Sequence, residues 1–442
     1  MSATEGNRKG PARIGPMSAR SLATRVLERV NRDAAYAAAA LDAEIERHPS
    51  LDTRDVALAT ELVYGVLRTR SVLVRELTRY ASRGLPDDPV VVTPLLLAAY
   101  QILLLDRVPG FAAVDAAVSA LKGVRGPKVA GFANAVLRKL AQSGEALSKE
   151  GAVLESVSPW LLAALTDAVG AEEASELVGA SSSPRDRASV RLVSGVTAPA
   201  FLRDAEPGRV SPIARLVPRG GDLRRREGYS DGAFVIQEEG AQVVALLCGA
   251  KPGEKVLDAC AGRGQKTSLL RERVGPDALL FATDLYAAKL DALRGEFERL
   301  HLRPPETAAV DWTVGGGDVP GGFDRVLVDA PCTGTGTLRR RPEIGLRLEP
   351  GDPARLAHVA ESILRHAAAH ARPGGIVVFA VCSVLPEEGE AVVTRVADVL
   401  EPAPFDSAEM AHLVPAGATS LRLLPLRDGT DGFFIACFRR RA

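Results

Sequence analysis

Residues 256–267 read Val256-Leu257-Asp258-Ala259-Cys260-Ala261-Gly262-Arg263-Gly264-Gln265-Lys266-Thr267. The apolar start predicts a short buried strand, the glycines predict a tight turn, and the polar end predicts a helix start. Such a turn lets the backbone approach a ligand at the carboxyl end of a parallel sheet. Thr267 replaces the third glycine of a dinucleotide fingerprint, and Gln265 and Cys260 break a P-loop. This stretch alone leaves open a binding turn of another class and a plain strand-to-helix turn.

From about residue 240 onward, short apolar strands alternate with helices. The predicted helices include residues 286–300 and 353–371, the second with Asp352 as its N-cap. The predicted strands are residues 256–258, 279–283, 307–310, 325–328 and 376–381. This alternation predicts a Rossmann-like α/β domain, in which helices cover both faces of a parallel sheet. Two last strands, 421–424 and 433–438, flank the turn 427–429 and predict an antiparallel hairpin.

Acidic residues end three of these strands: Asp284, Asp311 and Asp329. A carboxylate in the place of Asp284 can accept both hydroxyls of a ribose, and Asp311 can bond an adenine edge. One such residue is usually a helix cap or a turn residue. Together with the glycine turn they form a run of four, which predicts one nucleoside-binding crevice.

Two cysteines follow neighbouring strands at the same edge. Cys332 lies in Asp329-Ala330-Pro331-Cys332-Thr333-Gly334-Thr335-Gly336, and Cys382 follows Val381 directly. We expect both thiols to face the crevice. The ordinary interpretation of a single cysteine is a small buried filler. That interpretation is favoured for Cys248 and Cys437, and it is as good as any other for Cys260.

Methyl transfer to carbon 5 of cytosine would use two thiols. A thiolate that adds to carbon 6 makes carbon 5 nucleophilic, and a second group must then help to remove the carbon-5 proton. A free thiol has a pKa of about 8.5, so neighbouring cations must favour the thiolate. Lys266, Arg339 and Arg340 are candidates for that help. Enzymes that methylate nitrogen typically place Pro-Tyr or Pro-Phe where Pro331 is followed by Cys332.

The composition is that of an ordinary folded protein: 442 residues, 46% hydrophobic and 25% charged, with 55 basic and 55 acidic residues. It excludes disorder throughout, a coiled coil and a collagen-like repeat. The apolar run 90–105 is shorter than the roughly 20 residues of a membrane span and predicts a buried helix. Five cysteines without Cys-x-x-Cys spacing argue against disulfides and zinc, and six scattered histidines predict no metal. Free thiols without a secretory signal predict a cytoplasmic protein.

The chain divides into four expected segments. Residues 1–16 predict a disordered tail, and the helical spacing of residues 17–145 predicts an all-helical domain. A polar linker, 143–157, leads to a small α/β subdomain, 150–235, with strands at 188–192 and 233–236 and a turn at 181–184. Residues 236–442 form the parallel-sheet domain.

These motifs resemble the NOP2/Sun family of RNA cytosine-C5 methyltransferases, and the helical third resembles NusB-type RNA-binding domains. The pairs Pro331-Cys332 and Cys382-Ser383 are highly specific to that family. The matching segments follow the family's order: 237–242, 260–267, Asp284, Asp311, 329–336, 339–343, 382–388 and 431–434. Residues 65–68, 100–103 and 134–138 carry the NusB-like match.

The resemblance implies S-adenosylmethionine as methyl donor, Cys382 as nucleophile and Cys332 as the group that assists proton removal and product release. Asp329 and Lys266 belong to the same catalytic site. DNA cytosine-C5 methyltransferases instead use the Cys of their Pro-Cys motif as nucleophile. The implied donor-binding residues are Cys260, Ala261, Gly262, Arg263, Gly264, Gln265, Lys266, Asp284, Asp311 and Asp329.

The implied substrate is a cytosine of 16S rRNA, position 967, in free RNA or an early small-subunit particle. A looped-out base costs only a few kcal/mol to flip. A basic face for RNA could be formed by Arg68, Arg70, Arg125, Lys128, Arg138 and Lys139, which could equally be a solvated helix surface. Two alternatives stay open: the same chemistry on tRNA or another RNA, and a non-enzymatic RNA-binding protein. The intact Asp329, Cys332 and Cys382 count against the second.

Two departures from the family pattern stand out. The family's loop usually reads Ala-Pro-Gly-Gly-Lys, but Arg263 and Gln265 replace the proline and the second glycine here. Their side chains could crowd the methionine end of the donor or point to solvent. Val381 replaces the threonine before the nucleophile, which removes a hydroxyl and keeps the shape. Since neither change removes a catalytic group, we expect activity.

Overall fold

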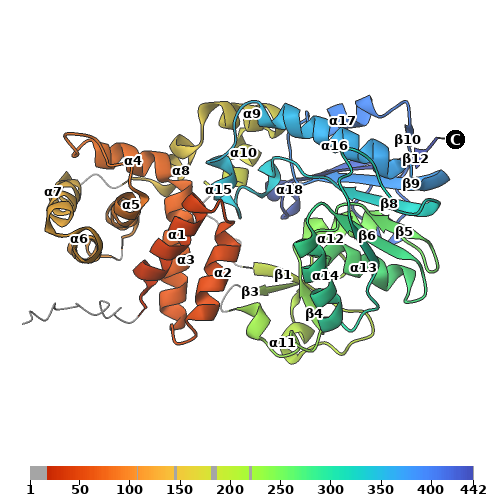
Figure 1. Cartoon of the computed structure of the whole chain (residues 1–442), viewed down its shortest axis with the longest axis horizontal. Coiled ribbons are helices and arrows are strands. Elements are labelled where there is room, and N and C mark those ends of the chain that lie inside the picture. Colours follow the sequence, from red (N-terminus) through yellow and green to blue (C-terminus); the bar gives the residue numbers. More distant parts are fainter. Residues whose placement is uncertain (1–16, 107, 144–146, 181–186, 219–221, 442) are drawn as a thin grey trace, which may run out of the picture. The chain divides into compact units, whose positions relative to one another are not determined.

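The computed structural model describes residues 17–106, 108–143, 147–180, 187–218 and 222–441 (Figure 1). The predicted tail 1–16 and the predicted turn 181–184 lie outside these residues. The chain forms two compact units, and the boundary between them falls after Ser156.

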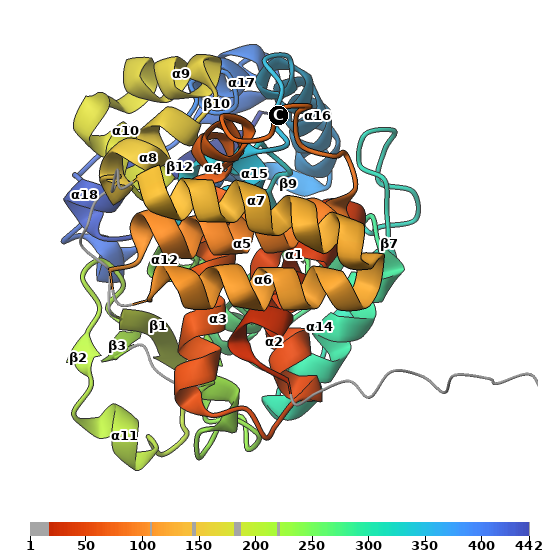
Figure 2. The ribbon, with the colours of Figure 1, turned by 90° about the vertical axis from the view of Figure 1, so that its left-hand side faces the viewer.

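The first unit is helical, as the spacing of its apolar residues predicts. Figure 2 shows α6 and α7 running side by side, and α5 packs against both. Its helices are α1 (Ala19–Arg32), α2 (Ala37–Arg47), α3 (Thr53–Arg68), α4 (Arg70–Thr78), α5 (Pro89–Leu104), α6 (Gly110–Arg125), α7 (Pro127–Ser143) and α8 (Lys149–Ser156). Buried leucines, valines and alanines from all of these helices form one core.

Helix α5 is the buried apolar helix that the sequence predicts. Asp88 caps it by accepting a hydrogen bond from Val90 N at 3.0 Å, and Pro89 occupies its first turn. Because α5 begins at Pro89, the second proline, Pro94, lies beyond the first turn, inside the helix. Within the described part of the chain, no single helix is long and apolar enough to cross a membrane; only the broken pair α8 and α9 (Pro159–Val169) reaches that length and composition together.

The predicted polar linker 143–157 is wrong in part, because it contains α8. Ala152 and Val153 of this helix are buried, and Val72 N of α4 donates to Ser156 Oγ at 3.2 Å. The Ala152 and Val153 side chains and the Ser156 hydroxyl hold this short helix against the first unit. The other residues of the segment are mostly polar, so its sequence gives little sign of a packed helix. The first unit therefore extends about ten residues beyond the expected end at 145.

The second unit begins with α9 and α10 (Ala171–Val178), followed by a small antiparallel sheet of order β2-β3-β1-β4. The predicted strands at 188–192 and 233–236 are confirmed as β1 (Arg187–Leu192) and β4 (Phe234–Ile236), which pair with each other. The rest of this part comprises α11 (Ala200–Arg203), β2 (Glu206–Pro207), β3 (Ala214–Pro218) and the 3-10 turn η1 (Leu223–Arg225).

The large sheet has the order β10-β12-β9-β8-β5-β6-β7, with β11 paired to β12. Strands β5 to β9 are parallel, and β12 runs antiparallel to β9, β10 and β11. The bounds are β5 (Val256–Asp258), β6 (Leu280–Asp284), β7 (Glu306–Ala309), β8 (Phe323–Asp329), β9 (Ala371–Val381), β10 (Leu400–Pro402), β11 (Ser420–Leu423) and β12 (Phe433–Arg440). The predicted parallel sheet and its antiparallel end are confirmed, and β10 is a short edge strand that the sequence analysis missed.

Helices cover both faces of this sheet (Figure 1). Along β9, Val377 and Phe379 pack toward the core under α16, while Val378 and Ala380 pack toward the core under α12 and α13. This alternation explains the continuous apolar run of the strand. The described helices of this part of the chain are α12 (Glu239–Leu247), α13 (Gln265–Val274), α14 (Ala287–Arg299), α15 (Pro342–Gly345), α16 (Asp352–Ala368), α17 (Glu390–Arg395) and α18 (Pro425–Asp428).

Two local predictions are wrong. Asp352 is not the N-cap of α16 but its first residue, and its carboxylate accepts a hydrogen bond from Glu349 N at 2.9 Å. The predicted hairpin turn at 427–429 is the end of α18, because Pro425 starts a helical turn that Gly429 ends at φ 79°. Both errors shift an element end without changing the pairing of the strands.

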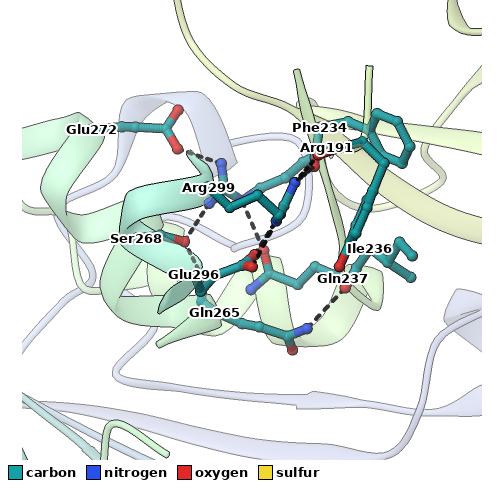
Figure 3. Close-up of polar contacts among 10 residues, drawn as sticks. Arg191, Phe234, Ile236, Gln237, Gln265, Ser268, Glu272, Glu296 and Arg299 are labelled. Atoms are coloured by element: carbon teal, nitrogen blue, oxygen red, sulfur yellow. Dashed lines mark hydrogen bonds and ion pairs between the residues drawn. The ribbon is translucent and has the colours of Figure 1, made fainter. Parts of the chain in front are cut away.

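A buried arginine joins the small sheet to α13 (Figure 3). Arg191 of β1 is fully buried; it donates to Ser268 Oγ at 2.6 Å and to Gln237 Oε1 at 2.9 Å, and it forms an ion pair with Glu272. Glu272 also accepts from Ser194 N at 2.9 Å. The Arg191 charge is thus balanced by the Glu272 carboxylate and its other N–H groups are hydrogen-bonded. The junction between the small sheet and α13 therefore depends on both Arg191 and Glu272.

We predict that Arg191→Ala destabilises the second unit by about 3–5 kcal/mol, because it leaves the Glu272 carboxylate buried without its cation. The matched control is Arg187→Ala on the same strand. Arg187 pairs with Glu206 in solvent, so its loss should cost at most about 1 kcal/mol. Urea unfolding of both variants measures the difference, and equal shifts would contradict the assigned role of Arg191.

Candidate active site

The glycine turn after β5 is held against the next strand. Ala261 N donates to Thr283 O at 2.8 Å, and Gly262 N donates to Asp284 Oδ2 at 3.1 Å. Gly264 has φ 85°, and a Cβ there would lie 2.6 Å from Leu293 Cγ. A side chain is therefore excluded at residue 264, and the turn brings its backbone close to the carboxyl end of the sheet.

The acidic strand ends lie near this turn but differ in their surroundings. Asp258 is buried; burial raises its pKa to about 6, and its Oδ2 accepts from Thr267 Oγ1 at 2.7 Å. Its Oδ1 meets no hydrogen-bond donor within the described part of the chain. Asp284 is nearly buried beside Gly262, whereas Asp311 is exposed and accepts from Thr313 Oγ1 at 2.6 Å.

The fourth strand end carries an ion pair. Lys266 Nζ lies 2.5 Å from Asp329 Oδ2, so the helix after the glycine turn is joined to the end of β8. Burial opposes the charge of Lys266, but the Asp329 carboxylate outweighs it and raises the lysine pKa. The ammonium therefore stays charged beside the thiols.

The structure brings Cys332 and Cys382 together: their Sγ atoms are 3.4 Å apart, and both side chains are partly exposed. A hydrogen bond from Cys332 lowers the pKa of Cys382 against the effect of burial, with further help from Arg341 and Lys266. The same contact and burial raise the pKa of Cys332. The pair thus favours a thiolate on Cys382 and a thiol on Cys332.

The three cations proposed to favour the thiolate lie in different places. Lys266 is near Cys382, as expected. Arg340 bonds Asp431 and lies close enough to Cys382 for the two charges to interact. Arg339 is not at the thiols, because its guanidinium donates to Glu176 Oε1 at 2.9 Å. The sequence analysis missed Arg341, although it belongs to the same run of arginines.

Buried polar groups to which the sequence analysis gave no structural role hold the two cysteine loops. Glu388 accepts from Thr333 N at 2.7 Å, and Ser383 bonds Thr335 Oγ1 at 2.9 Å. Gly336 N donates to Cys382 O at 3.0 Å, and Gly336 O accepts from Gly432 N at 2.8 Å. These bonds fix the loops after β8 and β9 and the start of β12 relative to one another.

Glu238 is a second group without a predicted role. It caps α12 by accepting from Ala241 N at 3.2 Å, and it accepts from Asp431 N at 2.9 Å. Burial, together with the Asp431 charge, raises the pKa of Glu238 to about 7. Through Asp431 this carboxyl group helps to hold Arg340 beside the thiol pair.

Comparison of the sequence with known proteins shows the family to which the chain belongs. A family model described as 16S rRNA methyltransferase RsmB/F matches residues 245–439, and the NusB family model matches 17–142. The putative methyltransferase Rv1407 of Mycobacterium tuberculosis is 36% identical over 98% of both chains. The probable ribosomal RNA small subunit methyltransferase B of Bacillus subtilis is 30% identical, over 96% of this chain and 99% of that relative. The chain belongs to the RsmB/F methyltransferase family.

Solved structures share the fold of this RsmB/F methyltransferase. The crystal structure of PH0851 superimposes with a TM-score of 0.82 at 20% identity, over 96% of this chain and 99% of the other. NSun6 from Pyrococcus horikoshii, solved with SFG, has a TM-score of 0.53 at 17% identity, over 65% and 100%. The predicted family, the NusB-like helical region and the α/β methyltransferase fold are confirmed.

The replaced glycine of the RsmB/F loop has a structural explanation. Gln265 Nε2 donates to Ile236 O at 2.9 Å, and Gln265 O accepts from Ser268 Oγ at 3.0 Å (Figure 3). The side chain thus lies at the exposed surface and reaches the end of β4, in agreement with the expectation that it points to solvent. Arg263 is exposed. Among the described residues, no three His, Cys, Asp or Glu side chains gather as around a metal ion, and the absence of a metal stays a prediction.

We predict that Gly336→Ala severely reduces methyl transfer by this enzyme. A Cβ on residue 336 would lie 2.0 Å from Gly432 O, so two backbones must separate and the Cys332 loop must shift. The matched control is Gly295→Ala in α14, where a Cβ meets open space. That change should leave transfer intact and stabilise the helix by roughly 0.5–1 kcal/mol. Similar rates for both variants would contradict the proposed importance of the contact.

Proposed function

We propose that this chain transfers a methyl group from S-adenosylmethionine to carbon 5 of a cytosine in 16S rRNA, at position 967, in the cytoplasm. The observation that carries the proposal is the pair of thiols 3.4 Å apart beside the glycine turn. Membership of a family described as 16S rRNA methyltransferases supports the substrate class. The substrate is either free rRNA or an early small-subunit particle.

The two thiols divide the chemistry. The Cys382 thiolate adds to carbon 6 of the cytosine, so that its electron pair forms the sulfur–carbon bond and the π pair of the carbon 5–carbon 6 double bond makes carbon 5 nucleophilic. S-adenosylmethionine, when bound, supplies a sulfonium methyl group that carbon 5 accepts, and the donor leaves as a thioether. Cys332 assists removal of the carbon-5 proton, after which the bond from carbon 6 to Cys382 breaks and the thiolate is restored. Asp329 and Lys266 hold opposite charges beside this pair.

The donor would be held by residues 260–266 together with Asp284, Asp311 and Asp329. Two observations fit such a ligand: the buried Asp258 Oδ1 without a donor in the described part of the chain, and the open space beside Gly262, where a Cβ would meet no atom within 4 Å. A cationic amino group would satisfy the first, and a close backbone approach would use the second. SFG, an analogue of this donor, is present in the NSun6 structure.

The NusB-like unit supplies an RNA-binding surface in this proposal. Helix α7 carries three exposed cations, Lys128, Arg138 and Lys139. The other predicted members contact neighbouring side chains: Arg125 Nε donates to Asp88 Oδ2 at 2.8 Å, Arg70 donates to Asn31 Oδ1 at 3.5 Å, and Arg68 lies over the ring of Tyr64. We therefore expect α7 to contribute most of the phosphate contacts.

We predict opposite outcomes for the two cysteines. Cys382→Ala should abolish methylation, because no nucleophile remains to attack carbon 6. Cys332→Ala should instead accumulate a covalent enzyme–RNA adduct, because the methylated product is released slowly. Denaturing gel electrophoresis with labelled RNA detects the adduct, and each variant controls for the other. An adduct formed by Cys382→Ala alone would reverse the two roles.

Bisulfite sequencing of total RNA from a deletion strain tests the substrate. We expect one 16S rRNA cytosine to lose its protection from deamination and to regain it when the wild-type chain is restored. Loss of protection only in tRNA would redirect the proposal to another RNA. Unchanged protection at every cytosine would overturn it.

A further inference from the structure

The thiol pair has a second chemical property besides its place in methyl transfer. Of the five cysteines, all in the described part of the chain, Cys332 and Cys382 are the two whose sulfur atoms are in contact. Both are free thiols and both are partly exposed. Cys248 and Cys437 are buried, and Cys260, although partly exposed, has no sulfur within contact distance in the structure described.

Hydrogen bonds around the pair hold the two cysteine loops next to each other. Thr333 and Ser383, which follow the two cysteines, lie with their hydroxyl oxygens 3.3 Å apart, and Glu388 holds Thr333 from below. Closing the sulfur separation from 3.4 Å to a disulfide length of about 2.05 Å requires a movement shorter than a carbon–carbon bond.

We propose that Cys332 and Cys382 form an intramolecular disulfide when the protein meets a peroxide, which makes the active site reversibly sensitive to oxidation. The Cys382 thiolate attacks the peroxide and becomes a sulfenic acid, and the peroxide is reduced to hydroxide. The Cys332 thiol then attacks that sulfur, the disulfide forms, and water leaves. A dithiol restores both thiols and is itself oxidised to a disulfide.

The bond would stop methyl transfer because it uses the electron pair of the proposed nucleophile. That consequence rests on the proposed function, whereas formation of the bond does not. The disulfide would also protect Cys382 from irreversible oxidation, since a sulfenic acid without a neighbouring thiol goes on to the sulfinic acid. Cys332 is therefore the resolving thiol in this proposal.

The test uses the full-length reduced chain, treated with hydrogen peroxide and mapped as peptides without reduction. We expect a linked peptide that joins Cys332 to Cys382 and loss of methyl transfer. Dithiothreitol should remove the linked peptide and restore methyl transfer. Cys260→Ser should still form the linked peptide. Cys332→Ser should give an over-oxidised Cys382 that dithiothreitol does not restore.

The peptide map separates the two proposals. Sulfinic Cys382 in the wild-type chain without a linked peptide would overturn the disulfide, even if methyl transfer proceeds as proposed. A linked peptide in a chain that methylates no cytosine would overturn the proposed function and leave the disulfide supported. A linked peptide that instead contains Cys260 would also overturn the proposal.

Discussion

Parallel pairing of β8 with β9 is the constraint on which the site depends. Asp329 of β8 lies opposite Ala380 of β9 in this register, so the two strands end at the same edge of the sheet. Cys332 lies three residues after Asp329, and Cys382 lies two residues after Ala380. Two cysteines fifty positions apart in the sequence thereby become neighbours. A shift of one residue in either strand would turn its whole set of side chains to the other face.

The surroundings of the two sulfur atoms then make them unequal. The hydrogen bond between them lowers the pKa of Cys382 and raises that of Cys332, and Arg341 and Lys266 add to the first effect. Burial alone would raise both values. One thiol is thus easier to deprotonate and the other keeps its proton, although both have the same chemistry in isolation.

Sequence patterns predicted what local periodicity and strand ends determine. The five parallel strands were predicted because each is an apolar run that ends in a polar residue or a glycine turn, and the positions of Cys332 and Cys382 followed from them. The presence of α8 was not predictable, because two small apolar residues in a polar segment give only a weak sign of a packed helix. The partners of Arg339 and Gln265 were equally hidden, since Glu176 and Ile236 are distant in sequence and only the fold brings them near.

The bond from Gln265 to Ile236, together with Arg191 between β1 and α13, makes the small sheet part of the support of the glycine turn after β5. This matters for anyone who recombines domains among relatives. A chimera joined near residue 236 would separate Arg191 of β1 from Ser268 and Glu272 of α13, whose side chains it needs, whereas Gln265 bonds only a main-chain carbonyl. The two pieces therefore have to be exchanged together, and relatives that differ at residue 191 are expected to differ at residue 272 as well.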